Sequence, residues 1–110
     1  MAPPAGKLEF LIYMPDHAGA SHKRQATRPL HIQGMKEDPE DFWQLGGFSV
    51  AEHPKAGGEP SPNGSAMIVY AESKDQVLER LRKDVFAKEG IWDVDNAHIV
   101  PFYSVVRRPV

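Results

Sequence analysis

The sequence predicts a single α+β domain whose elements follow one another as strand, helix, strand, strand, helix, strand. Its 110 residues have the length of one domain. Four segments carry aromatic, β-branched and other apolar residues in runs that are typical of strands. Another segment places apolar residues at helical spacing directly behind a helix-capping signal. These three observations predict one sheet with helices packed against it.

The first strand is predicted over residues 7–14, where every second residue is apolar and the residues between them are mixed in character. Pro15 and Asp16 end this strand. The following segment, 17–26, is polar and small with Gly19 inside it, so we expect a loop or an irregular turn there.

A first helix is expected over residues 28–36, although Gly34 weakens it. Thr27 is an acceptable N-cap, and Pro29 then falls in the first turn, where no intrahelical N–H is lost. An earlier start near Ser21 is the alternative. It places Pro29 in the middle of the helix and requires a kink there.

Three further segments are predicted as strands. Aromatic residues and valine favour a strand over residues 42–52, and a loop rich in proline and glycine follows over 54–64. Residues 65–71 are apolar on both faces, as in a central strand. The last strand is predicted over 97–106, and Pro101 inside it indicates an edge position or a bulge.

A second helix is expected to begin at Ser73, because Ser73 and Gln76 match a capping box. Residues 88–90 are expected to end this helical region. The apolar residues at helical spacing are Val77, Leu78, Leu81 and Val85.

This order of elements is the split βαβ pattern of a ferredoxin-like α+β fold. With both helices on one face, the other face of the sheet needs cover. A second copy of the chain is the simplest cover, and we therefore expect a homodimer with two sheets packed face to face.

The composition excludes several classes of function. Thirteen basic residues are dispersed among 15 acidic ones, with a net charge of −2, so we expect no nucleic-acid partner. No apolar run approaches the roughly 18 residues of a membrane-spanning helix, so we expect no membrane contact. The absence of cysteine fits a reducing compartment, and we expect a cytoplasmic protein. Residues 1–6 are expected to form a short flexible lead before one domain over 7–110.

One imidazole and one carboxylate are the best candidates for chemistry. His31 lies in the predicted first helix, and Asp84 lies 53 positions later, near the end of the second. An imidazole oriented by a carboxylate can transfer protons near neutral pH. Arg28, one helical turn before His31 on the same face, is a candidate for holding a substrate carboxylate or oxyanion, and an exposed salt bridge is the alternative.

Four further residues are candidates for lining a substrate pocket: Tyr13, Trp92, His17 and His22. Tyr13 lies on the less apolar face of the first strand, and the two histidines are expected in the loop before the first helix. Their five-residue spacing is not that of a helical metal-binding pair, and no HxH or HExxH motif is present. We therefore expect a site with neither a metal nor an organic cofactor.

Several short motifs are arranged as in a known family: EFLIY at residues 9–13, RPLH at 28–31, LGG at 45–47, DVF at 84–86 with Gly90, and VPF at 100–102. In this order and spacing they resemble the YciI-like (YCII-related) family of small dimeric α+β barrel proteins, and they cover nearly the whole chain. The family usually has proline directly after the aspartate, where this chain has Val85.

The resemblance implies a dimeric α+β barrel with a pocket between sheet and helices, in which the histidine and the aspartate lie close together. It also implies a lyase or isomerase of small, often phenolic, molecules, and fungal members resemble tailoring enzymes of polyketide pathways. We therefore expect a cofactor-independent cyclase, isomerase or lyase for a phenolic or polyketide-like metabolite, with His31 as the proton-transfer group supported by Asp84. The alternative is a non-catalytic small-molecule-binding or oligomerisation module, in which the two residues lie apart or have no cavity beside them.

Overall fold

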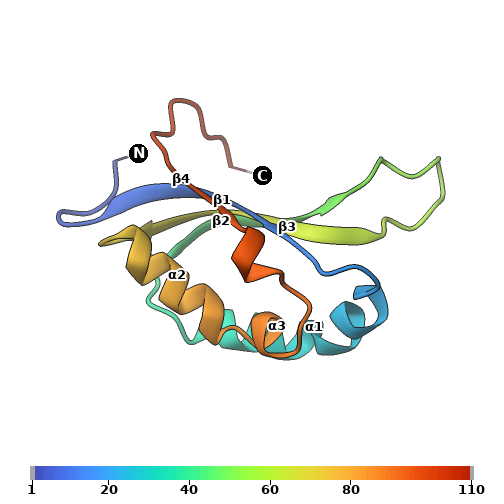
Figure 1. Ribbon diagram of the computed structural model, residues 1–110. Helices are drawn as coiled ribbons and strands as arrows, with labels where there is room; N and C mark the ends of the chain where they lie inside the picture. Colours follow the sequence, from blue (N-terminus) through green and yellow to red (C-terminus); the bar gives the residue numbers. More distant parts are fainter. Residues whose placement is uncertain (1, 110) are drawn as a thin grey trace.

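The computed structural model describes residues 2–109 and contains a four-stranded antiparallel sheet with α-helices on one face (Figure 1). The strands, in the spatial order β2-β3-β1-β4, are β1 (Leu8–Pro15), β2 (Trp43–Val50), β3 (Pro62–Ala71) and β4 (His98–Pro101). The helices are α1 (Ser21–Lys36), α2 (Lys74–Lys83), α3 (Val85–Lys88) and the 3₁₀ helix η1 (Val94–Asn96). The topology confirms the predicted ferredoxin-like α+β fold. Met1 of the expected lead and Val110 of the expected domain lie outside the described residues.

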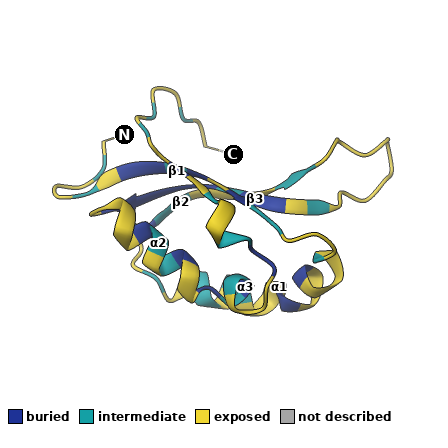
Figure 2. Ribbon diagram, in the orientation of Figure 1, coloured by how far each residue is buried: buried dark blue, intermediate teal, exposed yellow. Residues whose placement is uncertain are grey.

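The central strands β1 and β3 carry most of the core residues of the sheet, and Figure 2 colours much of both strands as buried. Alternate side chains of β1 point towards the helices. Phe10, Ile12 and Met14 are buried on that face of β1, whereas Glu9 and Tyr13 lie on the opposite face. As predicted, residues 65–71 form part of a central strand and the last strand lies at an edge. Other core side chains come from β3, α2, α3 and the segment after it: Met67, Val69, Val77, Leu81, Phe86, Ile91 and Trp92.

Helix α1 begins at Ser21, so the predicted start at residue 28 is wrong and the alternative start near Ser21 is correct. The first turn has no side-chain cap, and tertiary contacts of Arg24 replace it. The Arg24 guanidinium donates to the Gly64 carbonyl oxygen at 2.8 Å and to Ser65 Oγ at 2.5 Å. Pro29 therefore lies inside the helix. These long-range bonds offset the intrahelical bond that proline removes.

The segment predicted as the second helix is broken at Asp84. Ser73 caps α2 as expected, since its Oγ accepts a hydrogen bond from Gln76 N–H. Asp84 then adopts an extended conformation and caps α3, because Oδ1 accepts a hydrogen bond from Phe86 N–H at 2.9 Å. The aspartate thus makes the turn even though Val85 stands where the family usually has proline.

Strands β3 and β4 differ in length from their predictions. β3 begins at Pro62, three residues before the predicted start. Pro62 pairs with Val50, the last residue of β2. The predicted strand to residue 106 is wrong, because β4 ends at Pro101. Beyond it the tail crosses the face opposite the helices, where Phe102 N–H donates to the Glu9 carbonyl and Arg107 Nη2 donates to Glu9 Oε2 at 2.8 Å.

Candidate active site

The structure brings His31 and Asp84 into direct contact. His31 Nδ1 lies 2.7 Å from Asp84 Oδ1, and the two side chains are 12% and 1% exposed. His31 lies in the interior of α1, not near its start, because α1 is longer than predicted. Asp84 is the single residue between α2 and α3, and α3 packs against α1. The expected proximity of the two residues is confirmed.

Asp84 is surrounded by hydrogen-bond donors. Besides His31, Phe86 N–H donates to Oδ1, and Arg80 Nη1 donates to Oδ2 at 3.1 Å. Burial on its own raises the pKa of Asp84, but the hydrogen bonds from His31 and Phe86 and the charges of His31 and Arg80 outweigh it. The pKa of Asp84 therefore lies below its usual value, and the side chain is a carboxylate at neutral pH.

The carboxylate fixes which nitrogen of His31 carries the hydrogen. An ionised carboxylate only accepts hydrogen bonds, so Nδ1 of His31 is the donor in this pair. The second ring nitrogen, Nε2, has no hydrogen-bond partner within residues 2–109. It is the nitrogen that can exchange a proton with a ligand.

Two aromatic rings hold the imidazole in place. Phe86 stacks on His31 with ring centroids 4.0 Å apart and an interplanar angle of 7°. Trp92 meets the edge of the same ring, with centroids 5.2 Å apart. Because both aromatic residues are buried, the orientation of His31 is set by packing as well as by Asp84.

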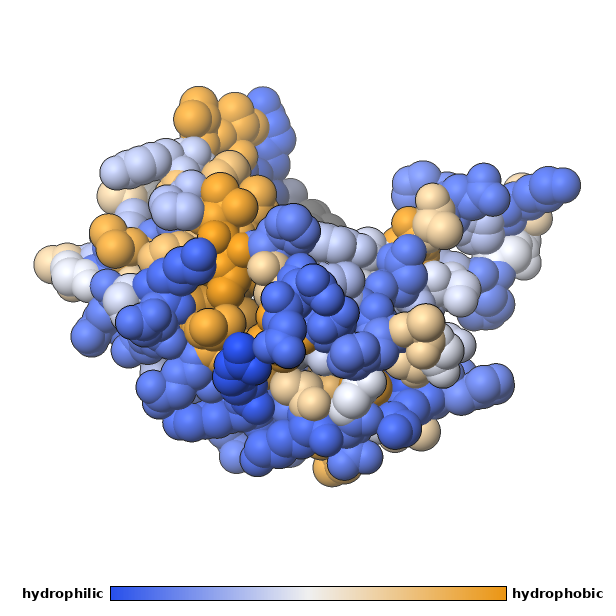
Figure 3. Space-filling model, in the orientation of Figure 1, coloured by the Kyte–Doolittle hydropathy of each residue, from blue (hydrophilic) through white to orange (hydrophobic). Residues whose placement is uncertain are grey.

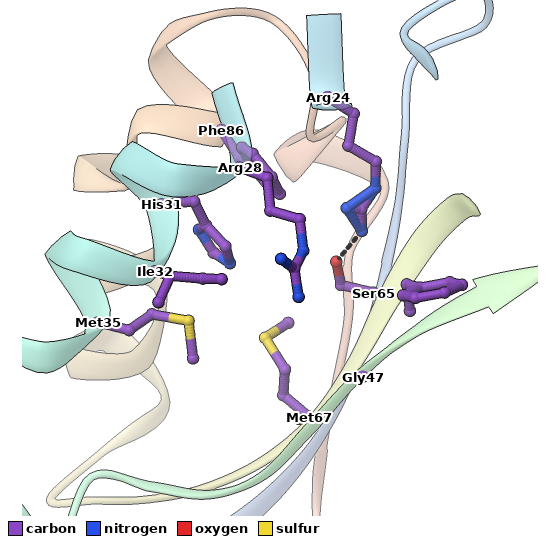
Figure 4. Close-up of a pocket in the computed structure, with 11 residues that line it drawn as sticks. Arg24, Arg28, His31, Ile32, Met35, Gly47, Ser65, Met67 and Phe86 are labelled. Carbon is purple, nitrogen blue, oxygen red and sulfur yellow. Dashed lines mark hydrogen bonds between the residues drawn. The ribbon is translucent and has the colours of Figure 1, made fainter. Parts of the chain in front are cut away.

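His31 lines a cavity of about 280 Å³ between α1 and the β2–β3 half of the sheet (Figure 4). The wall is mostly apolar, and one side of it is the glycine pair Gly46 and Gly47 of β2. The cavity-lining residues are Arg24, Arg28, His31, Ile32, Met35, Gly46, Gly47, Phe48, Ser65, Met67 and Phe86. A small ligand in this cavity contacts His31 and is shielded from water on several sides.

Two of the predicted substrate-binding residues lie at or beside this cavity. Arg28 lines it, one helical turn before His31. His22 belongs to α1, so its predicted place in a loop is wrong. It lines an adjoining hollow of about 740 Å³ that shares Arg24, Arg28 and Phe48 with the cavity. The two hollows therefore meet at these three residues.

The other three predicted pocket residues lie elsewhere. Tyr13 is on the sheet face opposite the helices, where its hydroxyl lies 3.2 Å from Ser49 Oγ. Trp92 is 2% exposed, and its indole N–H donates to Ser65 Oγ within the core. His17 lines a separate hollow near the end of α3. Trp92 thus positions cavity residues without lining the cavity, and Tyr13 and His17 have no contact with it.

Sequence reasoning missed Arg24, Ser65, Phe48 and Met67 as cavity residues. Arg24 falls in the segment predicted as a loop, so its helical face was not apparent. Ser65 and Met67 share one face of β3 by strand alternation, and this signal was present in the sequence.

Within residues 2–109, no three His, Asp or Glu side chains cluster closely enough to bind a metal ion. In the same part of the chain, none of the helices combines the length and the apolar character that crossing a membrane requires.

Comparison with known proteins gives relatives over nearly the whole chain. The chain is 34% identical over 106 residues to "Aspercryptin biosynthesis cluster protein B" of Emericella nidulans, covering 94% of this chain and 68% of that protein. It is 35% identical over 100 residues to "Fusaric acid biosynthesis protein 2" of Gibberella fujikuroi, covering 87% of this chain and 93% of that protein. No family model matches the chain.

Among solved structures, the chain is similar to the 5-chloro-2-hydroxyhydroquinone dehydrochlorinase TftG from Burkholderia phenoliruptrix AC1100, solved in complex with 2,5-dihydroxybenzoquinone. The TM-score is 0.74 at 24% identity, covering 87% of this chain and 94% of that one. This likeness shows that the fold is that of a dimeric α+β barrel subunit. The fungal relatives show that the chain belongs to the YciI-like family, in the group of fungal biosynthesis cluster proteins.

Proposed function

We propose that this protein is a cytoplasmic, cofactor-independent acid–base enzyme that modifies a small phenolic or polyketide-like metabolite. The observation that carries the proposal is the 2.7 Å bond between His31 Nδ1 and Asp84 Oδ1 at the wall of an apolar cavity. In this arrangement Nε2 takes a proton from a carbon or hydroxyl group of the bound molecule. Asp84 stabilises the imidazolium that forms.

The proton then completes one of two reactions. In a cyclisation or isomerisation, the imidazolium returns it to another atom of the same molecule, so no atom is gained or lost. In an elimination, the electron pair of the broken C–H bond forms a double bond, a leaving group departs with its own bonding pair, and the imidazolium releases its proton to the departing anion or to water. A positioned base contributes about 10²- to 10⁴-fold, and the cavity supplies orientation and exclusion of water.

The relatives support the chemical class of the substrate. The fungal relatives are named as biosynthesis cluster proteins, and the structural neighbour is named as a dehydrochlorinase of a chlorinated hydroxyhydroquinone. A cavity of about 280 Å³ with mostly apolar walls suits a molecule of one or two rings. We infer that this chain likewise acts on a small ring compound or its polyketide precursor.

A homodimer is part of the proposal. The sheet face opposite the helices and the tail that crosses it carry exposed apolar side chains, and Figure 3 shows apolar residues gathered along this side. The apolar side chains on this face and on the tail that are at least 45% exposed are Leu45, Val100, Tyr103, Val105 and Val106. A second copy packed on this face removes them from water.

The alternative is a binding protein without catalysis, and one observation favours it: Asp84 also caps α3 and pairs with Arg80, so it has a structural role of its own. Hydrogen–deuterium exchange at the ring carbons of phloroglucinol and the methylene of acetylacetone, followed by NMR, separates the two. We expect the protein to accelerate exchange, and His31→Ala to abolish the acceleration while the fold is retained.

His53→Ala is the matched control, because His53 is exposed in the β2–β3 loop and lines none of the hollows described above. It should exchange at the wild-type rate. Equal acceleration by His31→Ala and the wild type would rule out His31 as the proton-transfer group.

A further inference from the structure

The cavity carries positive charge that nothing in it neutralises. Its walls include two arginines and His31 but no Asp or Glu. Arg24 is paired outside the cavity, with its Nε 3.2 Å from Asp16 Oδ2. Arg28 has neither an ion pair nor a hydrogen bond to any residue within 2–109. One exposed guanidinium at the cavity wall therefore has no acceptor among the residues that the structure describes.

The two guanidinium groups also oppose one another. Burial lowers the pKa of Arg24; Asp16 raises it, and the nearby charge of Arg28 lowers it further. An anion bound in the cavity beside Arg28 offsets the repulsion between the two guanidinium groups.

Ser65 adds a neutral donor to the same wall. Its Oγ accepts hydrogen bonds from Arg24 Nη2 at 2.5 Å and from Trp92 Nε1 at 3.1 Å. Both bonds use lone pairs of the oxygen, so the hydroxyl proton is left to donate. Two donors on one hydroxyl, one of them cationic, polarise it and strengthen the bond that it donates. Figure 4 shows Arg28 extending from α1 into the space between His31 and Ser65.

We propose that this cavity binds its substrate through an anionic oxygen, a carboxylate or an enolate or phenolate, held by Arg28 and Ser65. The inference rests on the proposed function only in calling the ligand a substrate. Arg28 supplies the charge and Ser65 the directed hydrogen bond. Ile32, Met35 and Met67 contact the apolar remainder of the molecule.

The geometry also limits the distance between the anion and the reacting atom. Residues three apart on a helix have Cβ atoms about 5–6 Å from each other, and Arg28 and His31 are such a pair. The anionic oxygen and the proton that His31 exchanges therefore belong to the same small unit, as in a hydroxybenzoate or an enolised β-keto acid.

Salicylate and salicylamide test the inference, because they share a ring and a hydroxyl group and differ in the charge of one substituent. Each is titrated into the ¹⁵N-labelled protein, and the amide shifts of α1 and β3 are followed by NMR. We expect salicylate to bind the cavity at least about tenfold more tightly than salicylamide, the factor that a charge-assisted hydrogen bond provides.

Arg28→Gln should abolish this preference, and Arg82→Gln should keep it. Arg82→Gln is a suitable control because it removes the same charge from an exposed site on α2, where Arg82 pairs with Asp95. Ser65→Ala should weaken salicylate binding several-fold, and unchanged affinity in this variant would remove Ser65 from the site. Equal affinity for the two ligands, no binding of either, or full preference in Arg28→Gln would overturn the proposal.

His31→Ala separates this result from the proposed function. We expect it to lose proton exchange but to keep the preference for salicylate, because Arg28 and Ser65 are intact. If His31→Ala retains exchange while Arg28→Gln loses the anion preference, the acid–base role fails and the anion site stands.

Discussion

Arg80 and Asp84 form an ion pair on the side of the carboxylate that faces away from His31. Arg80 Nη1 lies 3.1 Å from Asp84 Oδ2, whereas His31 occupies Oδ1. Arg80 is held in turn by Asp38, whose Oδ1 accepts from Arg80 Nε at 2.7 Å and whose Oδ2 accepts from the Trp43 indole. A continuous set of bonds thus extends from the imidazole to the start of β2.

Arg80→Met should raise the pKa of Asp84, because it removes a cation that stabilises the carboxylate while the group stays buried. The carboxyl carbon of Asp84 reports this pKa in an NMR titration. Arg82→Met, an exposed neighbour on the same helix, is the matched control and should leave the Asp84 titration unchanged. An unaltered pKa of Asp84 in Arg80→Met would mean that the ion pair does not act on the carboxylate.

Asp84→Asn should destabilise the protein at neutral pH but not in acid. The folded pKa of Asp84 lies below its unfolded value of about 3.9, so the stability that it contributes is present above that pH and is lost as the pH falls through the folded pKa. We expect a loss of roughly 2–4 kcal/mol in the free energy of unfolding at pH 7, because a buried charged bond is broken while asparagine can still cap α3. Urea denaturation across the acid range measures it, and a difference that is constant with pH would contradict this account.

Most of the fold was predictable because its signals are local. Alternation in β1, the apolar run of β3 and the capping residue Ser73 each depend on neighbours in sequence, and the structure shows all three. The start of α1, by contrast, is not determined by local signals. Residues 21–27 have weak helical signals and are held by bonds from Arg24 to β3, which residue patterns within the helix do not reveal.

The candidate site was likewise predictable only in part. The contact between His31 and Asp84 was expected from a family resemblance and follows from the packing of α1 against α3. The break at Asp84 depends on one side-chain bond to Phe86 N–H, and it was hidden because Val85 continues the helical spacing. Trp92 was expected at a ligand, but the structure buries it, and its indole N–H donates to Ser65, which is distant in sequence.

The proposed dimer predicts that charges placed on the sheet face opposite the helices produce monomers. Leu45 and Val100 are 49% and 45% exposed on that face, where they pair with Ile68 and Leu11. Leu45→Asp together with Val100→Asp should halve the mass measured by light scattering, because burying two carboxylates per subunit is strongly unfavourable. Leu30→Asp is the control, since Leu30 is exposed on α1 and away from this face. A wild-type protein that is already monomeric would contradict the proposal.

Gly46→Val should fill the cavity without disturbing the strand. Gly46 pairs with Met67 in the ladder, so a side chain added there points towards the cavity, and its Cβ meets no heavy atom within 4 Å. Its φ lies outside the left-handed region, and valine is favourable in a strand, so we expect the melting temperature to be unchanged or slightly raised.

Ligand binding is expected to fall in this variant, because three methyl-sized groups occupy space beside His31 that a ring requires. Gly47→Val is the matched control: only the backbone of Gly47 borders the cavity, because Gly47 pairs with Ala66 and a side chain added there points to the opposite face. It should bind salicylate like the wild type. If Gly46→Val binds salicylate with wild-type affinity, the ligand does not lie against β2 in this cavity.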